Sequence, residues 1–252
     1  MIIELKSFFH DVGCFVVFAS RFFVELIRPP FETREFIRQC YVIGFKSLPL
    51  VAITGFIMGL VLTLQSRPTL ADFGAESWLP GMVALSLIRE IAPVITALIC
   101  AGKVASGIGA ELGSMKVTEQ IDAMEVSAIN PYKYLVVTRI LAATLMIPIL
   151  VIFADGIGIF GGFVGYNIHS DLNIIRYNSL IFENLSFMDI FPATIKSFFF
   201  GFSIGTVGCY KGFTASNGTE SVGKAANAAV VYASLAIFIL DLLAVQITDL
   251  FF

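Results

Sequence analysis

The run LPGMVALSLIREIAPVITALICAGKVASGIG, residues 79 to 109, is apolar and long enough to cross the hydrocarbon core of a bilayer as a helix. The next stretch, AELGSMKVTEQIDAMEV, residues 110 to 126, is instead rich in charge, and a new apolar run begins near residue 134. Its charged residues are Glu111, Lys116, Glu119, Asp122 and Glu125. A polar, helix-prone segment therefore lies between two predicted membrane spans.

Composition extends this interpretation to the whole chain. The 252 residues are 57% hydrophobic and only 14% charged, and the mean hydropathy is +0.88. A soluble domain of this size cannot bury so much apolar surface, because its core grows more slowly than its length. The net charge of −3 argues against nucleic acid as a partner. We therefore predict an all-α membrane protein with a single domain over residues 1–252.

Five segments have the roughly 20 apolar residues that a spanning helix needs. They are residues 46–66, 79–109, 134–165, 191–211 and 225–250. The second and third exceed a minimal span, so we expect them to tilt or to project beyond the lipid.

Residues 1–28 are predicted to form an amphipathic helix at the membrane interface. An apolar stripe at helical spacing comprises Phe8, Val12, Phe15, Ala19, Phe22 and Leu26. Off this stripe are Ser7, Asp11, Arg21, Glu25 and Arg28. A further full span is the alternative, and Pro29 and Pro30 end the helix in either case.

Lysine and arginine placement predicts the orientation. Basic residues precede the first span and also cluster beside the second-to-third and fourth-to-fifth connections. The other side has only Arg67, Arg176 and Lys196. The N-terminus and the charged stretch are then cytoplasmic, and an odd number of spans places the C-terminus outside.

Small residues recur in the spans as GxxxG motifs, which allow helix backbones to approach closely. They are Gly55–Gly59, Gly109–Gly113, Gly158–Gly162 and Gly201–Gly205, with AANAAVVYASLA in the fifth span. We favour packing within one bundle over a seam between two copies, although both remain open.

The charged stretch is predicted to form a short helix. Thr118 can cap it, Glu119 and Asp122 suit the dipole of its first turn, and Asn130–Pro131 ends it. About 11 helical residues would extend about 16 Å. One face carries Val117, Ile121, Met124 and Ala128. The helix is either a solvated connector or a docking element for a soluble partner.

Arg89 and Glu90 are ionisable residues within the second span. Each costs about 2.5–3.5 kcal/mol at such depth, and adjacent residues do not face each other on a helix. They form either a structural ion pair with other helices or the polar edge of a lipid cavity. Asp155 and Asp241 lie in other spans, where hydrogen bonding between helices or protonation is expected.

The sequence offers no metal or nucleotide site. The four cysteines form no CxxC pair, and the two histidines, His10 and His169, are far apart. GFSIG (201–205) falls in an apolar helix without the strand of a nucleophile elbow. GTESVGKA (218–225) has Ala225 in place of the Ser or Thr of a phosphate-binding loop. Cys100 and Cys209 are expected to be small buried apolar residues.

The run VALSLIREIAPVITALICAGKVASGIGAELGSMKVTEQIDAMEVSAINPYKYLVVTRILA resembles the signature region of MlaE-type permeases. These are the membrane subunits of ABC transporters that move lipids with MCE-domain proteins. LPLVAITGFIMGLVLTLQ, ADGIGIFGGFVG and GTESVGKAANAAVVYASLAIFILD also resemble the family. The similarity extends from about residue 41 onward and is weaker in the N-terminal helix and in residues 166–190. Lys103 stands where relatives often have arginine, which keeps the charge.

The resemblance implies two groups of site residues. Residues 115–128 would be a coupling helix that docks in a cytoplasmic ATPase. Its members are Lys116, Thr118, Glu119, Gln120, Ile121, Asp122, Met124 and Glu125. The cavity for lipid, between two permease copies, would include Arg89, Glu90, Leu62 and Phe73.

The resemblance also implies a non-enzymatic permease subunit for phospholipid or a related lipid in the bacterial inner membrane, with the C-terminus periplasmic. ATP and Mg would bind to the partner ATPase. Further partners would be an MCE protein on the outer side, a second copy and a small cytoplasmic accessory subunit. A scaffold that only anchors an MCE protein is the alternative. An intramembrane lipid enzyme would need a convergent nucleophile, base or metal set, which is not visible.

Overall fold

The computed structural model describes residues 2–29, 31–168, 170–216 and 218–251. Side chains of residues 2–11 and 251 are not described, so Phe8, Asp11 and both histidines lie outside the part that can be compared with expectation. The described residues form helices and no strand, as predicted.

Among the described residues, five helical stretches are long and apolar enough to cross a membrane. They run Thr33–Asp72, Glu76–Val117, Tyr132–Asn167, Phe187–Phe213 and Thr219–Leu250. Each contains one of the predicted spans and extends beyond it by several residues at one or both ends. Five helices of membrane-spanning length, in the predicted order along the chain, are therefore confirmed within the described residues.

The long stretches are built from shorter elements. The first joins α2 (Thr33–Ile43), η1 (Phe45–Ser47) and α3 (Leu48–Asp72). The second joins η2 (Glu76–Trp78), α4 (Leu79–Ser86), η3 (Leu87–Ile91), α5 (Ala92–Cys100), η4 (Ala101–Ala105) and α6 (Ser106–Val117). The last three are η5 (Tyr132–Val137) with α8 (Thr138–Asn167), then α10 (Phe187–Phe213), then α11 (Thr219–Phe251). η3, η4 and η5 are π-helical turns, which sequence periodicity does not reveal.

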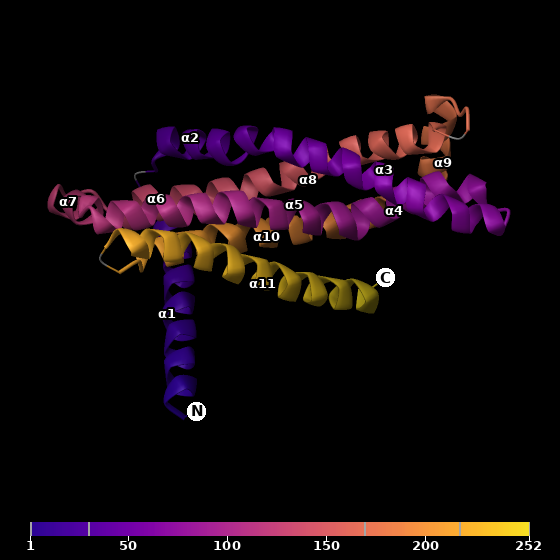
Figure 1. The fold of residues 1–252 in the computed structure, drawn as a ribbon. Helices are drawn as coiled ribbons and strands as arrows, with labels where there is room; N and C mark the ends of the chain where they lie inside the picture. Colours follow the sequence, from indigo (N-terminus) through magenta and orange to yellow (C-terminus); the bar gives the residue numbers. More distant parts are fainter. Residues whose placement is uncertain (1, 30, 169, 217, 252) are drawn as a thin grey trace.

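The long helices lie side by side along one axis (Figure 1). α8 packs against α3, α2 and α10, and α10 also packs against α6 and α11. The short helix α7 (Gln120–Val126) lies at one end of the bundle and α9 (Ile174–Asn184) lies at the other. α9 was not expected, and it covers α4 with the buried side chains of Tyr177 and Ile181.

The GxxxG motifs bring helices of this one chain together. A Cβ on Gly59 would lie 1.8 Å from the Gly158 carbonyl oxygen, and one on Gly161 would lie 2.2 Å from that of Phe56. α3 and α8 therefore touch through their backbones. Gly201 and the other glycines of these motifs likewise contact neighbouring helices, among them the alanines of α11. Packing within the bundle, the favoured interpretation, accounts for these residues.

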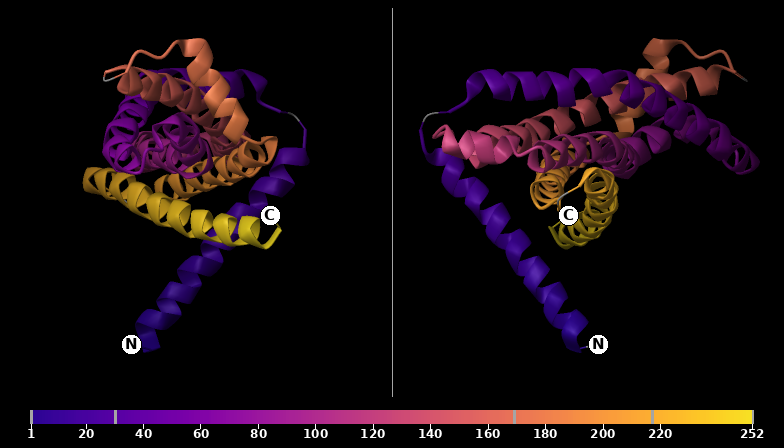
Figure 2. Two further views of the ribbon diagram at one scale, coloured as in Figure 1. Left: turned by 90° about the vertical axis from the view of Figure 1, so that its right-hand side faces the viewer. Right: turned by 60° about the vertical axis from the view of Figure 1, so that its left-hand side comes forward.

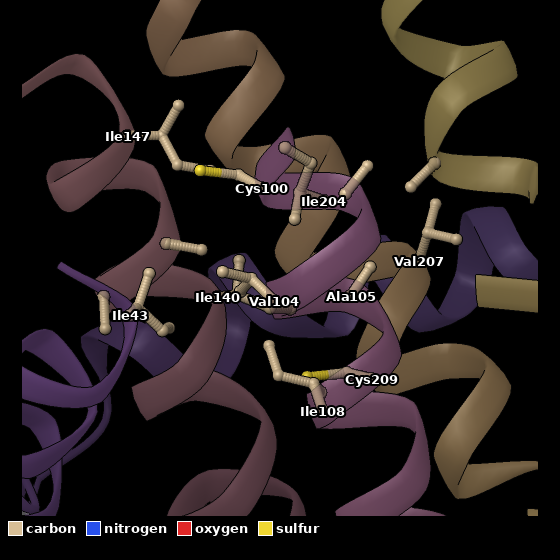
Figure 3. Close-up of a cluster of buried hydrophobic side chains, with 14 of the residues drawn as sticks. Ile43, Cys100, Val104, Ala105, Ile108, Ile140, Ile147, Ile204, Val207 and Cys209 are labelled. Carbon is tan, nitrogen blue, oxygen red and sulfur yellow. The ribbon is translucent and has the colours of Figure 1, made fainter. Parts of the chain in front are cut away.

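The core shown in Figure 3 lies where α5, η4 and α6 of the second long stretch meet α8 and α10. Cys100 and Cys209 are fully buried free thiols in this cluster, as expected of small apolar residues. Ile140, Ile147 and Ile204 fill the space around them.

Helix α1 (Ile2–Ile27) leaves the bundle and runs across its long axis (Figures 1 and 2). Phe15, Phe22 and Leu26 of the predicted stripe pack against the body, but Val12 is exposed. Glu25, expected on the polar face, is only 7% exposed, because it bonds to residues of the body. An interfacial position of α1 stays a prediction.

Candidate functional site

A charged cluster joins three of the long helices near the middle of the bundle. Lys196 Nζ of α10 donates to Glu90 Oε2 at 2.7 Å and to Asp241 Oδ1 at 3.0 Å. The charge pattern counted Lys196 among the basic residues on the outer side of the membrane, and that side assignment stays a prediction. The side chain is 5% exposed and lies inside the bundle, because two carboxylates from η3 and α11 compensate its charge.

The π turn η3 positions the adjacent residues Arg89 and Glu90. Such a turn inserts an extra residue into the helix and re-aims the side chains around it. Glu90 bonds to Lys196, whereas Arg89 Nη1 lies 3.8 Å from Asp189 Oδ1 near the start of α10. Each residue thus has a partner on another helix, as an ion-pair role requires. Both side chains also keep almost half of their surface exposed.

Glu90 and Asp241 also line an apolar groove of about 470 Å³ between α3, α5 and α11. The structure therefore places Leu62 and Glu90, two of the expected cavity residues, beside the same space. Its lining is Met58, Val61, Leu62, Gln65, Glu90, Ile91, Val94, Ile95 and Asp241. We call this the α3–α11 groove.

The other two expected cavity residues do not line the α3–α11 groove. Phe73 follows the end of α3 and is 81% exposed. Arg89 lines a small polar hollow with Asp189, Lys196 and Asp249. Next to it, an apolar hollow of about 530 Å³ lies between α10 and α11. The Lys196 cluster thus stands between this hollow and the α3–α11 groove.

The two remaining acids of the spans behave differently. Asp241 bonds to another helix, as expected. Asp155 of α8 has a buried carboxylate oxygen that meets no hydrogen-bond partner within the described residues. Its expected bond between helices is therefore not present at that oxygen.

The charged stretch after the second span folds differently from the predicted 115–128 helix. α6 continues to Val117, and α7 covers only Gln120–Val126. Glu119, at φ 58°, is the N-cap and makes no side-chain capping bond. Thr118 was expected to cap the helix, which is wrong, because its hydroxyl donates to the Ser114 carbonyl at 2.8 Å and so closes α6 instead.

α7 ends at Val126, before the Asn130–Pro131 pair that was expected to stop it. Ala128 adopts φ 59°, and its N–H donates to the Glu125 carbonyl while the Ile129 N–H donates to that of Met124. These two bonds form a Schellman motif, which terminates a helix through a left-handed residue. The end is therefore fixed by backbone geometry.

The two faces of α7 have separate roles. Ile121 is 1% exposed and packs with half-buried Met124 on the core of this same chain. These two members of the expected docking set therefore anchor α7. The outward face presents Gln120, Asp122, Glu125 and Val126, and Val126 is 91% exposed. Lys116 Nζ holds Asp122 Oδ1 at 2.8 Å.

Sequence reasoning missed Lys196 and the link between Glu90 and Asp241. One signal in the sequence could have revealed them. A lysine and two acids lie in three separate apolar spans, and charged groups within a membrane usually pair with one another. Within the described residues, no three of His, Cys, Asp and Glu gather as a metal site would require.

A bundle with five spanning-length helices, a charged cluster beside an apolar groove and a short exposed helix at one end defines a multi-pass membrane protein. Residues 36–247 match the sequence family described as Permease MlaE, and the chain belongs to that family.

Three relatives show how far the similarity extends. A "Probable ABC transporter permease protein" of Rickettsia felis is 41% identical over 98% of this chain and 94% of its own length. A protein of that description from Synechocystis is 36% identical over 94% of this chain and 90% of its own length. The "Intermembrane phospholipid transport system permease protein MlaE" of Haemophilus influenzae is 34% identical over 94% and 92%, respectively.

Proposed function

We propose that this chain is the permease subunit of an ABC transporter that moves phospholipid or a related lipid, and that a separate ATPase supplies the energy. The names of the relatives support the transporter class and, for one of them, phospholipid. The α3–α11 groove carries the proposal for this chain, because its apolar walls suit acyl chains and its Glu90 and Asp241 give it a polar side.

The groove also supports a homodimer. It is built from one copy, lies open at the surface of the bundle, and about 470 Å³ is small for a two-chain lipid. A second copy facing the first would enclose the lipid from both sides. Leu62 and Glu90 are then lipid contacts, and Arg89 and Phe73 lie at the margin of the enclosed space.

The outward face of α7 is the proposed docking surface for the ATPase. It is exposed and mostly polar, and Ile121 on the other face of α7 packs on the core. In this arrangement the α7 end is cytoplasmic, the N-terminus lies on that side, and the C-terminus is periplasmic in the bacterial inner membrane. An MCE protein would meet the opposite end, and ATP and Mg would bind to the ATPase.

The test is co-purification of the ATPase with variants of this face. Glu125→Lys and Val126→Asp change exposed side chains that make no core contact, so the chain should still fold. We expect each to reduce ATPase recovery about tenfold, in line with hot-spot residues. Glu183→Lys, an exposed change on α9 at the other end, is the control. Undiminished ATPase recovery by both α7 variants would refute the docking role, and ATPase recovery without lipid movement would favour the scaffold.

A further inference from the structure

The segment that leaves α7 is bonded to helix α1, although the two are about 105 residues apart in sequence. We call residues 130–133 the exit segment. Asn130 Nδ2 donates to Glu25 Oε2 at 3.4 Å, and Lys133 Nζ donates to the Arg28 carbonyl. The Tyr132 hydroxyl donates to the Phe18 carbonyl within α1. Three of the four residues of the exit segment thus bond to α1 or to Arg28, the residue that follows it.

Three of the side chains in these contacts are buried, which makes the loss of their bonds costly. Tyr132 is 2% exposed, Lys133 is 8% exposed and Glu25 is 7% exposed. A buried polar group without a partner loses its hydration and gains nothing in return. The exit segment and α1 are therefore expected to move together rather than to separate.

Lys133 occupies a favourable position for such a bond. Arg28 directly follows the last residue of α1, where carbonyl groups lack helical donors and carry partial negative charge. The ammonium group satisfies one of these carbonyls. The Arg21 guanidinium lies 4.5 Å from the centre of the Tyr132 ring and adds a cation–π contact to the same joint.

α1 connects the exit segment to a second helix of the bundle. The rings of Phe15 and Tyr210 are 5.3 Å apart, and those of Phe22 and Phe202 are 5.6 Å apart. Tyr210 and Phe202 belong to α10, the helix that carries Lys196. α1 thus bridges the start of the third span and the fourth span from outside the bundle.

The structure also leaves room for α7 to move against this bridge. A hollow of about 340 Å³ lies between Arg21 and the end of α7, lined there by Glu125 and Ile129. The exit segment overlaps the first two residues of the π turn η5, which starts at Tyr132 and leads into α8. Along the chain, a shift of α7 therefore reaches α8 through residues that are bonded to α1 and Arg28.

We propose that α1 is a lever which positions the exit segment, so that displacement of α7 is passed to α8 and α10. Tyr132, Lys133 and Glu25 are its positioning residues. This inference rests on the proposed function, in which an ATPase displaces α7.

The first test measures lipid transferred per ATP hydrolysed by the complete transporter in phospholipid vesicles. Lys133→Met removes the ammonium group and keeps the side-chain length. We expect unchanged ATPase binding and a loss of about fivefold or more in lipid per ATP, the size of a typical coupling energy. Lys133→Arg should restore the ratio. The control is Lys224→Met, whose ammonium is exposed and pairs only with Glu220 of the same helix within the described contacts.

A merely structural role of Lys133 would lower the amount of folded, ATPase-bound protein and leave lipid per ATP unchanged, and that result would overturn the lever. If Lys133→Met does not accumulate, Tyr132→Phe replaces it as the test variant. This change removes only the hydrogen bond to the Phe18 carbonyl and keeps the contact between the two rings, whose centres are 5.0 Å apart. An unchanged ratio in Tyr132→Phe would overturn the lever equally.

A second measurement separates this inference from the proposed function. Hydrogen exchange of the purified chain reports the joint without any ATPase. We expect the amides of residues 123–129 to exchange about fivefold faster in Lys133→Met than in the wild type, as local opening becomes easier. Lys224→Met should match the wild type. Equal exchange in the wild type, Lys133→Met and Lys224→Met would overturn the lever. If instead the wild-type chain is purified without any bound ATPase, only the proposed function is refuted.

Discussion

Lys196 of the fourth span and Asp241 of the fifth are bonded at 3.0 Å, and this bond ties the C-terminal half of α11 to α10. α11 buries one side chain per helical turn, and the last of these is Ile237. The buried apolar residues are Ala225, Ala229, Ala233 and Ile237. Beyond that residue Leu242, Leu243 and Ile247 are exposed, and the last two line the apolar hollow between α10 and α11. Glu90 accepts a second hydrogen bond from the same ammonium group, so one lysine joins three helices.

Lys196→Met is expected to destabilise the protein by about 3–5 kcal/mol, because it removes a buried ammonium that is the one cation paired with Glu90 and Asp241 among the described contacts. Thermal unfolding in detergent, followed by the monodisperse fraction, measures the effect. The triple variant Lys196→Met, Glu90→Gln, Asp241→Asn should recover most of the loss, since no uncompensated charge remains. A single variant as stable as the wild type would show that the cluster contributes nothing to the fold.

The fold class and the five spans follow from composition and length, because a bilayer imposes both on every spanning helix. The Lys196 cluster does not follow from them. Counting basic residues along the chain treats each as solvated, whereas the position of Lys196 is fixed by acids on two other helices. Which helices become neighbours depends on packing of small residues, which the local pattern does not specify.

Gly59→Ala is expected to disrupt the contact between α3 and α8. The new Cβ would lie 1.8 Å from the Gly158 carbonyl oxygen, a backbone atom that cannot move without shifting the helix. We expect a loss of about 3 kcal/mol or more, at the upper end for overpacked sites. Gly156→Ala on α8 is the matched control, because a Cβ there meets nothing within 4 Å. Equal melting temperatures of the two variants would contradict the backbone contact.

Ala128→Gly is expected to stabilise the end of α7 by about 1 kcal/mol, because Ala128 has φ 59° and only glycine adopts that conformation without strain. Ala123→Gly, in the middle of α7, should instead weaken the helix by about 1 kcal/mol. Hydrogen exchange of the α7 amides distinguishes the two, with slower exchange in the first variant and faster in the second. Faster exchange in Ala128→Gly would mean that the Schellman geometry is not maintained in solution.

The same two residues explain why the coupling stretch was only partly predictable. Its charge, its helical tendency and its place between spans are visible in the residues. Its bounds are not, because Glu119 and Ala128 adopt left-handed conformations that glycine or asparagine would normally signal. Ile121 was correctly placed on an apolar face, but that face meets the core of this chain.

A photoreactive residue at Leu62 is expected to crosslink to phospholipid in a way that depends on Glu90, because both line the α3–α11 groove. Ile53 of the same helix is 60% exposed and does not line it, so a probe there should crosslink to bulk lipid regardless of Glu90. With Glu90→Gln, we expect the yield at position 62 to change about tenfold or more, the size of a lost charge-assisted hydrogen bond, and the yield at 53 to stay constant. Mass spectrometry of the adducts gives both yields. If the yield at 62 does not respond while transport also continues unchanged, Glu90 serves only to join the helices.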